Sequence, residues 1–139
     1  MESSDELGGL AWRGLEPFGV EVDFDLREPL NDKQIRALTQ LFHRDGLVVL
    51  RNQELTVEQQ IGVVSHLGPV IRALDGVGII STDPAVGSLG TGELAYHSDY
   101  SFTPHPLQVL SLHAIDVRDG ASSTRYVSAM RAFERLRKS

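Results

Sequence analysis

A histidine and an aspartate lie two positions apart in the segment Tyr96-His97-Ser98-Asp99-Tyr100. In an extended chain, residues two apart point to the same face, so the His97 imidazole and the Asp99 carboxylate can converge on one small object. Together they offer two of the three side chains of the two-histidine, one-carboxylate arrangement that holds non-haem Fe(II). From the triplet alone, a surface histidine paired with a nearby carboxylate is the simpler alternative.

Aromatic residues and prolines surround this triplet. Tyr96, Tyr100 and Phe102 flank the two polar side chains, and the turn Pro104-His105-Pro106 follows them. We therefore expect an aromatic-walled, dry metal pocket at the end of a strand. His105, or His113 in the next apolar segment, is an alternative third ligand.

The segments before the triplet predict the elements that position it. Apolar and acidic residues alternate from Val20 to Asp25, which predicts a half-buried strand. Asn31 with Gln34 forms a capping-box pattern that begins a helix, and Gly46 ends it. The apolar run at residues 47–50 predicts a buried strand.

The rest of the chain continues with a second helix and then mostly strands. Thr56 with Gln59 is another capping signal, and Gly68-Pro69 ends the helix that it begins. Short strands and a mobile loop are expected over residues 70–94, and the longest strand over 107–117. Ser128 is expected to cap a last helix, whose apolar residues are Met130, Phe133 and Leu136.

The order of these elements predicts an α+β fold, because helices and strands are segregated along the chain. Residues 1–17 are expected to be a loose lead-in. The sequence contains none of the glycine-rich phosphate-binding patterns and no G-x-S-x-G motif, which removes common nucleotide-binding and serine-hydrolase functions.

Composition sets further limits. The chain has 139 residues, no cysteine and a net charge of −6, which predicts one domain without disulfides or thiolate metal sites. The acidic balance argues against a nucleic-acid partner. No apolar run is long enough for a membrane span, and the acidic N-terminus lacks the positive start of a signal peptide. A cytoplasmic location is the expectation.

Five blocks in order resemble the TauD/TfdA (taurine dioxygenase) family of Fe(II)- and 2-oxoglutarate-dependent dioxygenases, over roughly residues 18–137. Each block by itself is a weak signal, whereas their shared order and spacing is a strong one. The blocks are 19–26 with Pro29-Leu30; 46–53; 55–60 with Leu67-Gly68-Pro69; His97-Ser98-Asp99 with Ser101-Phe102 and Pro106; and 120–124 with Ser128 and Ala132-Phe133-Glu134.

The resemblance implies a fold and a set of roles. The implied fold is a double-stranded β-helix, or jelly roll, with N-terminal helices packed on the sheet. His97 and Asp99 would be metal ligands, and Thr124 would hold a carboxylate of 2-oxoglutarate; the alternative for Thr124 is a strand residue without such a role. Glu93 lies where many relatives carry an asparagine near the substrate. A carboxylate there would favour a cationic or hydroxylated substrate group, and the simpler alternative is that Glu93 faces solvent. Arg51 is expected to anchor the structure by pairing with an acid. The implied partners are a small-molecule substrate and oxygen, and a homo-oligomer is compatible with them.

The chain departs from the family in ways that limit this reading. The family's distal histidine and arginine come about a hundred residues further on, so residues 18–139 resemble the N-terminal half of the domain and the jelly roll is expected to be incomplete. Val70-Ile71-Arg72-Ala73 lacks the histidine that taurine-oxidising members carry, and Ala121-Ser122-Ser123 replaces a Gly-Gly turn. The alternative function is a non-catalytic remnant, or an interaction or metal-binding module that needs a partner to complete its sheet.

Overall fold

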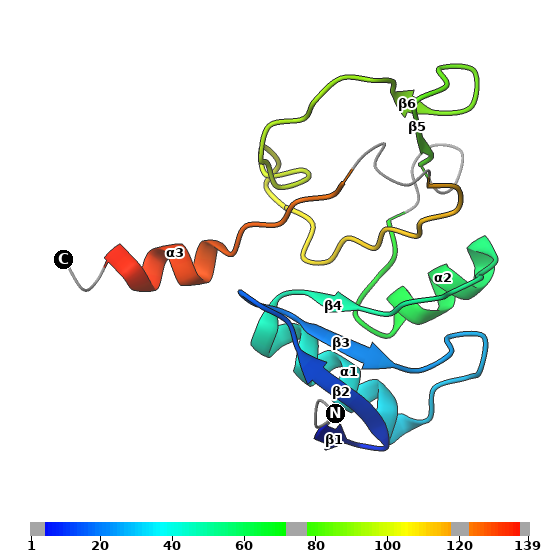
Figure 1. The fold of residues 1–139 in the computed structure, drawn as a ribbon, viewed down its shortest axis with the longest axis vertical. Helices are drawn as coiled ribbons and strands as arrows, with labels where there is room; N and C mark the ends of the chain where they lie inside the picture. The colour runs from blue at the N-terminus through cyan, green and yellow to red at the C-terminus, as the bar shows by residue number, and fades with distance from the viewer. Residues whose placement is uncertain (1–4, 72–77, 118–122, 137–139) are drawn as a thin grey trace.

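The computed structural model describes residues 5–71, 78–117 and 123–136. Its larger sheet has four strands in the order β1-β2-β3-β4. The first three are antiparallel neighbours, and β4 runs parallel to β3. The helix α1 (Asp32–Asp45) follows β3 and precedes β4 in the sequence, and it covers one face of the sheet (Figure 1). The strands are β1 (Asp5–Leu7), β2 (Leu10–Gly14), β3 (Val20–Asp23) and β4 (Val48–Val49).

The hydrophobic core lies between this sheet and α1. Three residues of α1 point into it, and the strands β2 and β3 supply the others. Partly buried hydrophobic side chains from β1, β2 and β4, from the loops next to the strands and from the helix α2 (Val57–Ser65) pack around this centre. In the described residues, the buried hydrophobic side chains are Leu10, Val20, Val22, Ala37, Leu38 and Leu41.

The expectation of a loose lead-in is wrong for residues 5–14, which form a hairpin. Leu7 pairs with Leu10, so Gly8 and Gly9 make a two-residue turn. Both glycines have positive φ, 61° and 86°, as the hairpin turns that match strand twist require. In the sequence, the Gly-Gly dipeptide between two apolar residues is the pattern that could have predicted this hairpin. Burial of Leu10 against α1 then fixes the hairpin on the core.

Both predicted capping boxes are confirmed. The Asn31 side chain accepts hydrogen bonds from the backbone of Lys33 and Gln34, and the Gln34 side chain accepts one from the Asn31 backbone. At the other end of α1, Gly46 has a left-handed φ of 73° and donates to the Phe42 carbonyl at 2.7 Å. Thr56 begins α2 (Val57–Ser65) in the same way, with Gln59 as its partner.

The strand expected at residues 47–50 is shorter and less buried than its apolar run indicates. Only Val48–Val49 pair with β3, and both are half-buried. The reason is the position of β4 at the edge of the described sheet, where a strand has a neighbour on one side alone.

The expected strand over 107–117 is also wrong: in the described residues it is extended chain without ladder hydrogen bonds. An apolar run becomes a strand only when another strand supplies backbone partners, and side-chain contacts hold this segment instead. Farther up the molecule, β5 (Ile80–Ser81) and β6 (Ser88–Leu89) form a small parallel pair (Figure 1).

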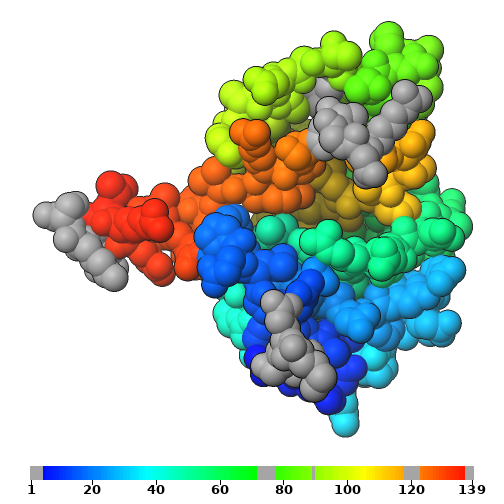
Figure 2. Space-filling model, in the orientation of Figure 1, coloured from blue at the N-terminus to red at the C-terminus, as the bar shows by residue number. Residues whose placement is uncertain are grey.

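The last helix, α3 (Ala129–Leu136), begins where it was predicted to begin. The Ser128 hydroxyl accepts a hydrogen bond from the Arg131 backbone at 3.2 Å. The helix projects from the body of the molecule (Figure 2), and its apolar residues Met130, Phe133 and Leu136 are exposed. The described residues thus form a mixed sheet with helices, in agreement with α+β composition. None of their helices is long and apolar enough to cross a bilayer.

Candidate metal centre

The structure brings His97 and Asp99 together. The His97 Nε2 and the Asp99 Oδ1 lie 3.0 Å apart, in a segment without helix or strand. Ligand atoms at adjacent corners of an octahedral ion with bonds of about 2.1 Å are separated by about 3 Å. The spacing of these two atoms therefore suits two neighbouring positions on one cation.

The second nitrogen of His97 is held by the backbone. Its Nδ1 lies 2.8 Å from the Ala95 carbonyl oxygen. Because that oxygen can only accept, Nδ1 carries the proton and donates it, and in the neutral ring Nε2 keeps a free lone pair. Metal-bound histidines are commonly oriented by such a bond from the other nitrogen. The donor set of this pair fits a cation such as Fe(II) at two positions.

The same contacts favour the protonated ring when no cation is bound. The hydrogen bond to Ala95, and then the charge of Asp99, raise the pKa of the His97 imidazole above its ordinary value of 6.5. Protonated Nε2 can donate to the Asp99 carboxylate as an ion pair. A proton and a metal ion thus compete for the same nitrogen.

A third ligand is not present in the part of the chain that the structure describes, where no three histidine or acidic residues cluster. His105 is exposed. His113 instead places its Nε2 3.2 Å from the Gln53 carbonyl oxygen. Neither histidine joins His97 and Asp99, so these residues supply two of three positions.

The expectation of a dry, aromatic-walled pocket is wrong for the described residues. The side chains of His97 and Asp99 are 52% and 33% exposed. Tyr96, Tyr100 and Phe102 are exposed as well. An aromatic flank makes a dry pocket only when other elements pack over it, and here no described element does so.

The turn after the pair is fixed by its own hydrogen bonds. The Tyr100 carbonyl accepts from the Thr103 backbone at 3.0 Å and from the Thr103 hydroxyl at 2.9 Å. Tyr100 itself has a φ of 56°, a left-handed conformation that residues with a side chain adopt at a cost. The hydrogen bonds of Thr103 help to hold this conformation directly beside Asp99.

Two other predicted site residues lie away from this contact. Thr124 is in the extended chain before α3, and Glu93 precedes the metal segment; both are exposed. No hydrogen bond or ion pair between described residues links either one to His97 or Asp99. Their predicted roles therefore remain predictions.

Arg51 pairs with an acid, as predicted. Its Nε lies 2.9 Å from Glu21 Oε2. A second guanidinium, that of Arg13, lies 3.0 Å from Glu21 Oε1. The Glu21 carboxylate on β3 thereby links Arg51, which follows the edge strand β4, to Arg13 on β2.

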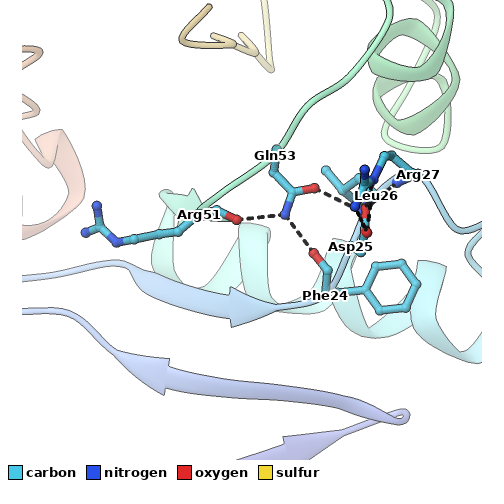
Figure 3. Close-up of polar contacts among 6 residues, drawn as sticks. All are labelled: Phe24, Asp25, Leu26, Arg27, Arg51 and Gln53. Atoms are coloured by element: carbon cyan, nitrogen blue, oxygen red, sulfur yellow. Dashed lines mark hydrogen bonds and ion pairs between the residues drawn. The ribbon is translucent and has the colours of Figure 1, made fainter. Parts of the chain in front are cut away.

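Gln53 is a structural residue whose role the sequence motifs did not reveal. Its side-chain Nε2 donates to the carbonyls of Phe24 (2.9 Å) and Arg51 (2.8 Å), and its Oε1 accepts from the Leu26 backbone (Figure 3). The Gln53 backbone carbonyl meets His113. The Gln53 amide thus joins the chain after β3 to the chain after β4. In the sequence, the only indication of this role is that Gln53 follows Arg51-Asn52.

Three side-chain contacts fasten the extended segment around residue 111 to the core. His113 reaches Gln53, and the Gln60 amide donates to Ser111 at Oγ (3.0 Å) and at the carbonyl (3.4 Å). These contacts hold the chain that follows the metal segment against the end of β4 and against α2.

The described chain thus combines a mixed four-stranded sheet with a later segment in which a histidine and an aspartate lie 3.0 Å apart. The family model that matches is "Taurine catabolism dioxygenase TauD, TfdA family", over residues 11–139. The chain belongs to this family, and the match includes part of the hairpin that precedes residue 18.

The chain is also similar to a curated dioxygenase. The chain is 26% identical over 140 residues to the alpha-ketoglutarate-dependent 2,4-dichlorophenoxyacetate dioxygenase of Cupriavidus pinatubonensis (strain JMP 134 / LMG 1197). The alignment covers 85% of this chain and 48% of that protein, so the chain spans about half the length of its relative. No solved structure matches the chain.

Proposed function

We propose that this chain is the N-terminal part of an Fe(II)- and 2-oxoglutarate-dependent dioxygenase that oxidises a C–H bond of a small organic substrate. The observation that supports it most is the 3.0 Å approach of His97 Nε2 and Asp99 Oδ1, with His97 Nδ1 oriented by Ala95. Family membership and the dioxygenase relative support the same reaction class. A jelly-roll fold is the family expectation for the whole domain.

Each site residue has a stated role in this proposal. His97 supplies a neutral nitrogen and Asp99 a carboxylate oxygen, which together hold the cation. Iron bound there would supply the redox chemistry that couples 2-oxoglutarate decarboxylation to substrate oxidation. The Thr124 hydroxyl would donate to a carboxylate of 2-oxoglutarate. Glu93 would face the substrate and accept from a hydroxyl or cationic group.

A module that needs a partner is the second candidate function, and a specific observation favours it. The buried hydrophobic residues of the described chain all lie between Leu10 and Leu41, whereas exposed apolar side chains are spread over residues 71–136. These side chains would leave water if a partner packed on this part of the chain, which would stabilise such a complex. In this alternative, the chain binds a partner and has no turnover of its own.

Metal binding is the first test. Titration of the purified chain with Co(II), as a spectroscopic substitute for Fe(II), should give a visible absorption band. We expect His97→Ala or Asp99→Ala to weaken binding at least about tenfold, as loss of even an outer-shell partner does. His105→Ala is the matched control, because His105 is exposed on the following turn. Binding that is unaffected by His97→Ala would exclude this site.

Turnover is the second test. Succinate release that requires Fe(II) and 2-oxoglutarate and disappears in His97→Ala would support the dioxygenase. Metal binding at His97 and Asp99 without succinate release would favour the partner-requiring module. Thr124→Val should raise the concentration of 2-oxoglutarate needed for half-maximal release, because the methyl group cannot donate a hydrogen bond.

A further inference from the structure

The backbone at Tyr100 has a conformation that its residue type does not explain. In the described residues, Asn52 and Tyr100 are the non-glycine residues with positive φ, each at 56°. Asparagine adopts this left-handed form readily, whereas the Cβ of most other residues comes too close to the following carbonyl oxygen. This clash lowers the population of the left-handed form by about five- to thirtyfold. Contacts in the surrounding turn must therefore favour the left-handed form at Tyr100.

Asp99 and Tyr100 occupy the two central positions of a four-residue turn. The Ser101 backbone N–H donates to the Ser98 carbonyl across this turn, at a long distance of 3.4 Å. Turns of type II require a positive φ at their third position, which Tyr100 occupies. Closure of the turn couples the backbone angles of its two central residues, and the φ of Asp99 aims its carboxylate. The left-handed form of Tyr100 is thus linked to the 3.0 Å approach of His97 Nε2 and Asp99 Oδ1.

Thr103 supplies contacts that favour this form of the turn. Its backbone N–H and its hydroxyl both donate to the Tyr100 carbonyl, at 3.0 Å and 2.9 Å. Both bonds are shorter than the bond that closes the turn around Asp99. Thr103 is also half-buried, between the exposed residues Phe102 and Pro104. Two donors on one carbonyl fix the orientation of the peptide group that follows Tyr100.

We infer that Tyr100 is a positioning residue whose left-handed backbone, held by Thr103, aims the Asp99 carboxylate at the cation. The inference rests on the proposed function, since it assigns a further residue to the same site. The role belongs to the backbone of Tyr100, whose side chain is exposed. The apparent affinity of a site falls with the fraction of the chain that has the binding-competent conformation. A substitution that changes this fraction therefore changes the affinity for metal.

Co(II) titrations of the full chain test this role through the backbone preference of residue 100. We expect Tyr100→Val to weaken Co(II) binding at least about fivefold, because a β-branched residue resists the left-handed form. Tyr100→Asn should bind Co(II) at least as tightly as the unchanged chain, although it lacks the ring. Tyr96→Val is the matched control and should leave the affinity unchanged, because Tyr96 is an exposed neighbour of His97 that is not left-handed.

A second pair of variants tests the contribution of Thr103. Thr103→Val keeps the shape of the side chain but removes its hydrogen bond, and it should weaken Co(II) binding about two- to tenfold. Thr103→Ser keeps the hydroxyl and should restore the affinity. Circular dichroism should show the same unfolding transition in all these variants, because the buried hydrophobic residues of the described chain lie between Leu10 and Leu41.

Two results would overturn the positioning role. They are equal Co(II) affinities of Tyr100→Val and Tyr100→Asn, and equal affinities of Thr103→Val and Thr103→Ser. In either case, binding by the unchanged chain that is lost in His97→Ala would leave the proposed function intact. Absence of Co(II) binding in the unchanged chain would overturn both proposals. The expected order of affinities without succinate release would support the positioning role and favour the partner-requiring module over the dioxygenase.

Discussion

At the scale of single residues, Glu21 shows how a carboxylate can be stabilised at a partly open position. The hydrogen bonds from Arg51 and Arg13 lower the pKa of the Glu21 carboxyl below its ordinary value of 4.5. The folded chain therefore releases the proton more readily than the unfolded chain. Glu21 stabilises the fold fully above pH 4.5, and this contribution is lost as the pH falls through its lowered pKa.

Replacing Glu21 should flatten this acid dependence. We expect Glu21→Gln to lower the free energy of unfolding at pH 7 by no more than about 1 kcal/mol, because the guanidinium partners are exposed. Urea titrations between pH 7 and pH 3 would measure the difference between the two proteins, which should shrink toward the acid end. Glu134→Gln, on the exposed surface of α3, is the control. A difference that grows on acidification would contradict the assignment.

At the scale of elements, Gln53 connects parts of the chain that are distant in sequence. Its amide bonds the backbone after β3 and after β4, and its carbonyl contacts His113. The local capping signals of α1 and α2 could be found in the sequence because each involves groups within four residues. Three partners of Gln53, namely Leu26, Phe24 and His113, are 27 to 60 residues away, so no local pattern identifies them.

Removal of this amide should loosen the junction. Gln53→Ala leaves the partly buried backbone groups of Phe24 and Leu26 without their partner, and we expect a loss of about 1–3 kcal/mol in unfolding free energy. Chemical denaturation followed by circular dichroism would measure it. The control is Gln40→Ala on the exposed face of α1, which should change stability by less than about 0.5 kcal/mol. Equal effects of the two substitutions would show that the junction contributes little.

At the scale of the whole molecule, stability is concentrated in one part of the chain. The buried side chains of the described residues lie in the hairpin, β3 and α1. The extended segment 107–117 and α3 expose their apolar side chains, including Leu112 and Phe133. Replacing apolar side chains should therefore lower the free energy of unfolding strongly before residue 50 and much less after residue 100.

A matched pair of leucines tests this distribution. Leu41 is fully buried in the core, whereas Leu112 is half exposed in the extended segment. We expect Leu41→Ala to cost about 2–5 kcal/mol and Leu112→Ala less than about 1 kcal/mol. Thermal unfolding monitored by circular dichroism would compare them. A comparable loss at Leu112 would mean that a second core forms in solution around residues 107–117.

The sequence by itself determined the caps of α1, α2 and α3, the strand β3 and the approach of His97 to Asp99. These features depend on groups a few residues apart, so backbone geometry and local hydrogen bonding suffice to specify them. The five ordered blocks also identified the family. Neither the local patterns nor the five blocks determined the substrate or a third metal ligand.

The tertiary structure decided which apolar segments found partners. Residues 5–14 became a hairpin because Leu10 packs against α1, β4 stayed half-buried because it lies at an edge, and 107–117 formed no ladder in the described chain. It also left the aromatic flank of His97 and Asp99 exposed. Strand pairing and burial depend on contacts between distant residues, and a pattern along the chain does not contain that information.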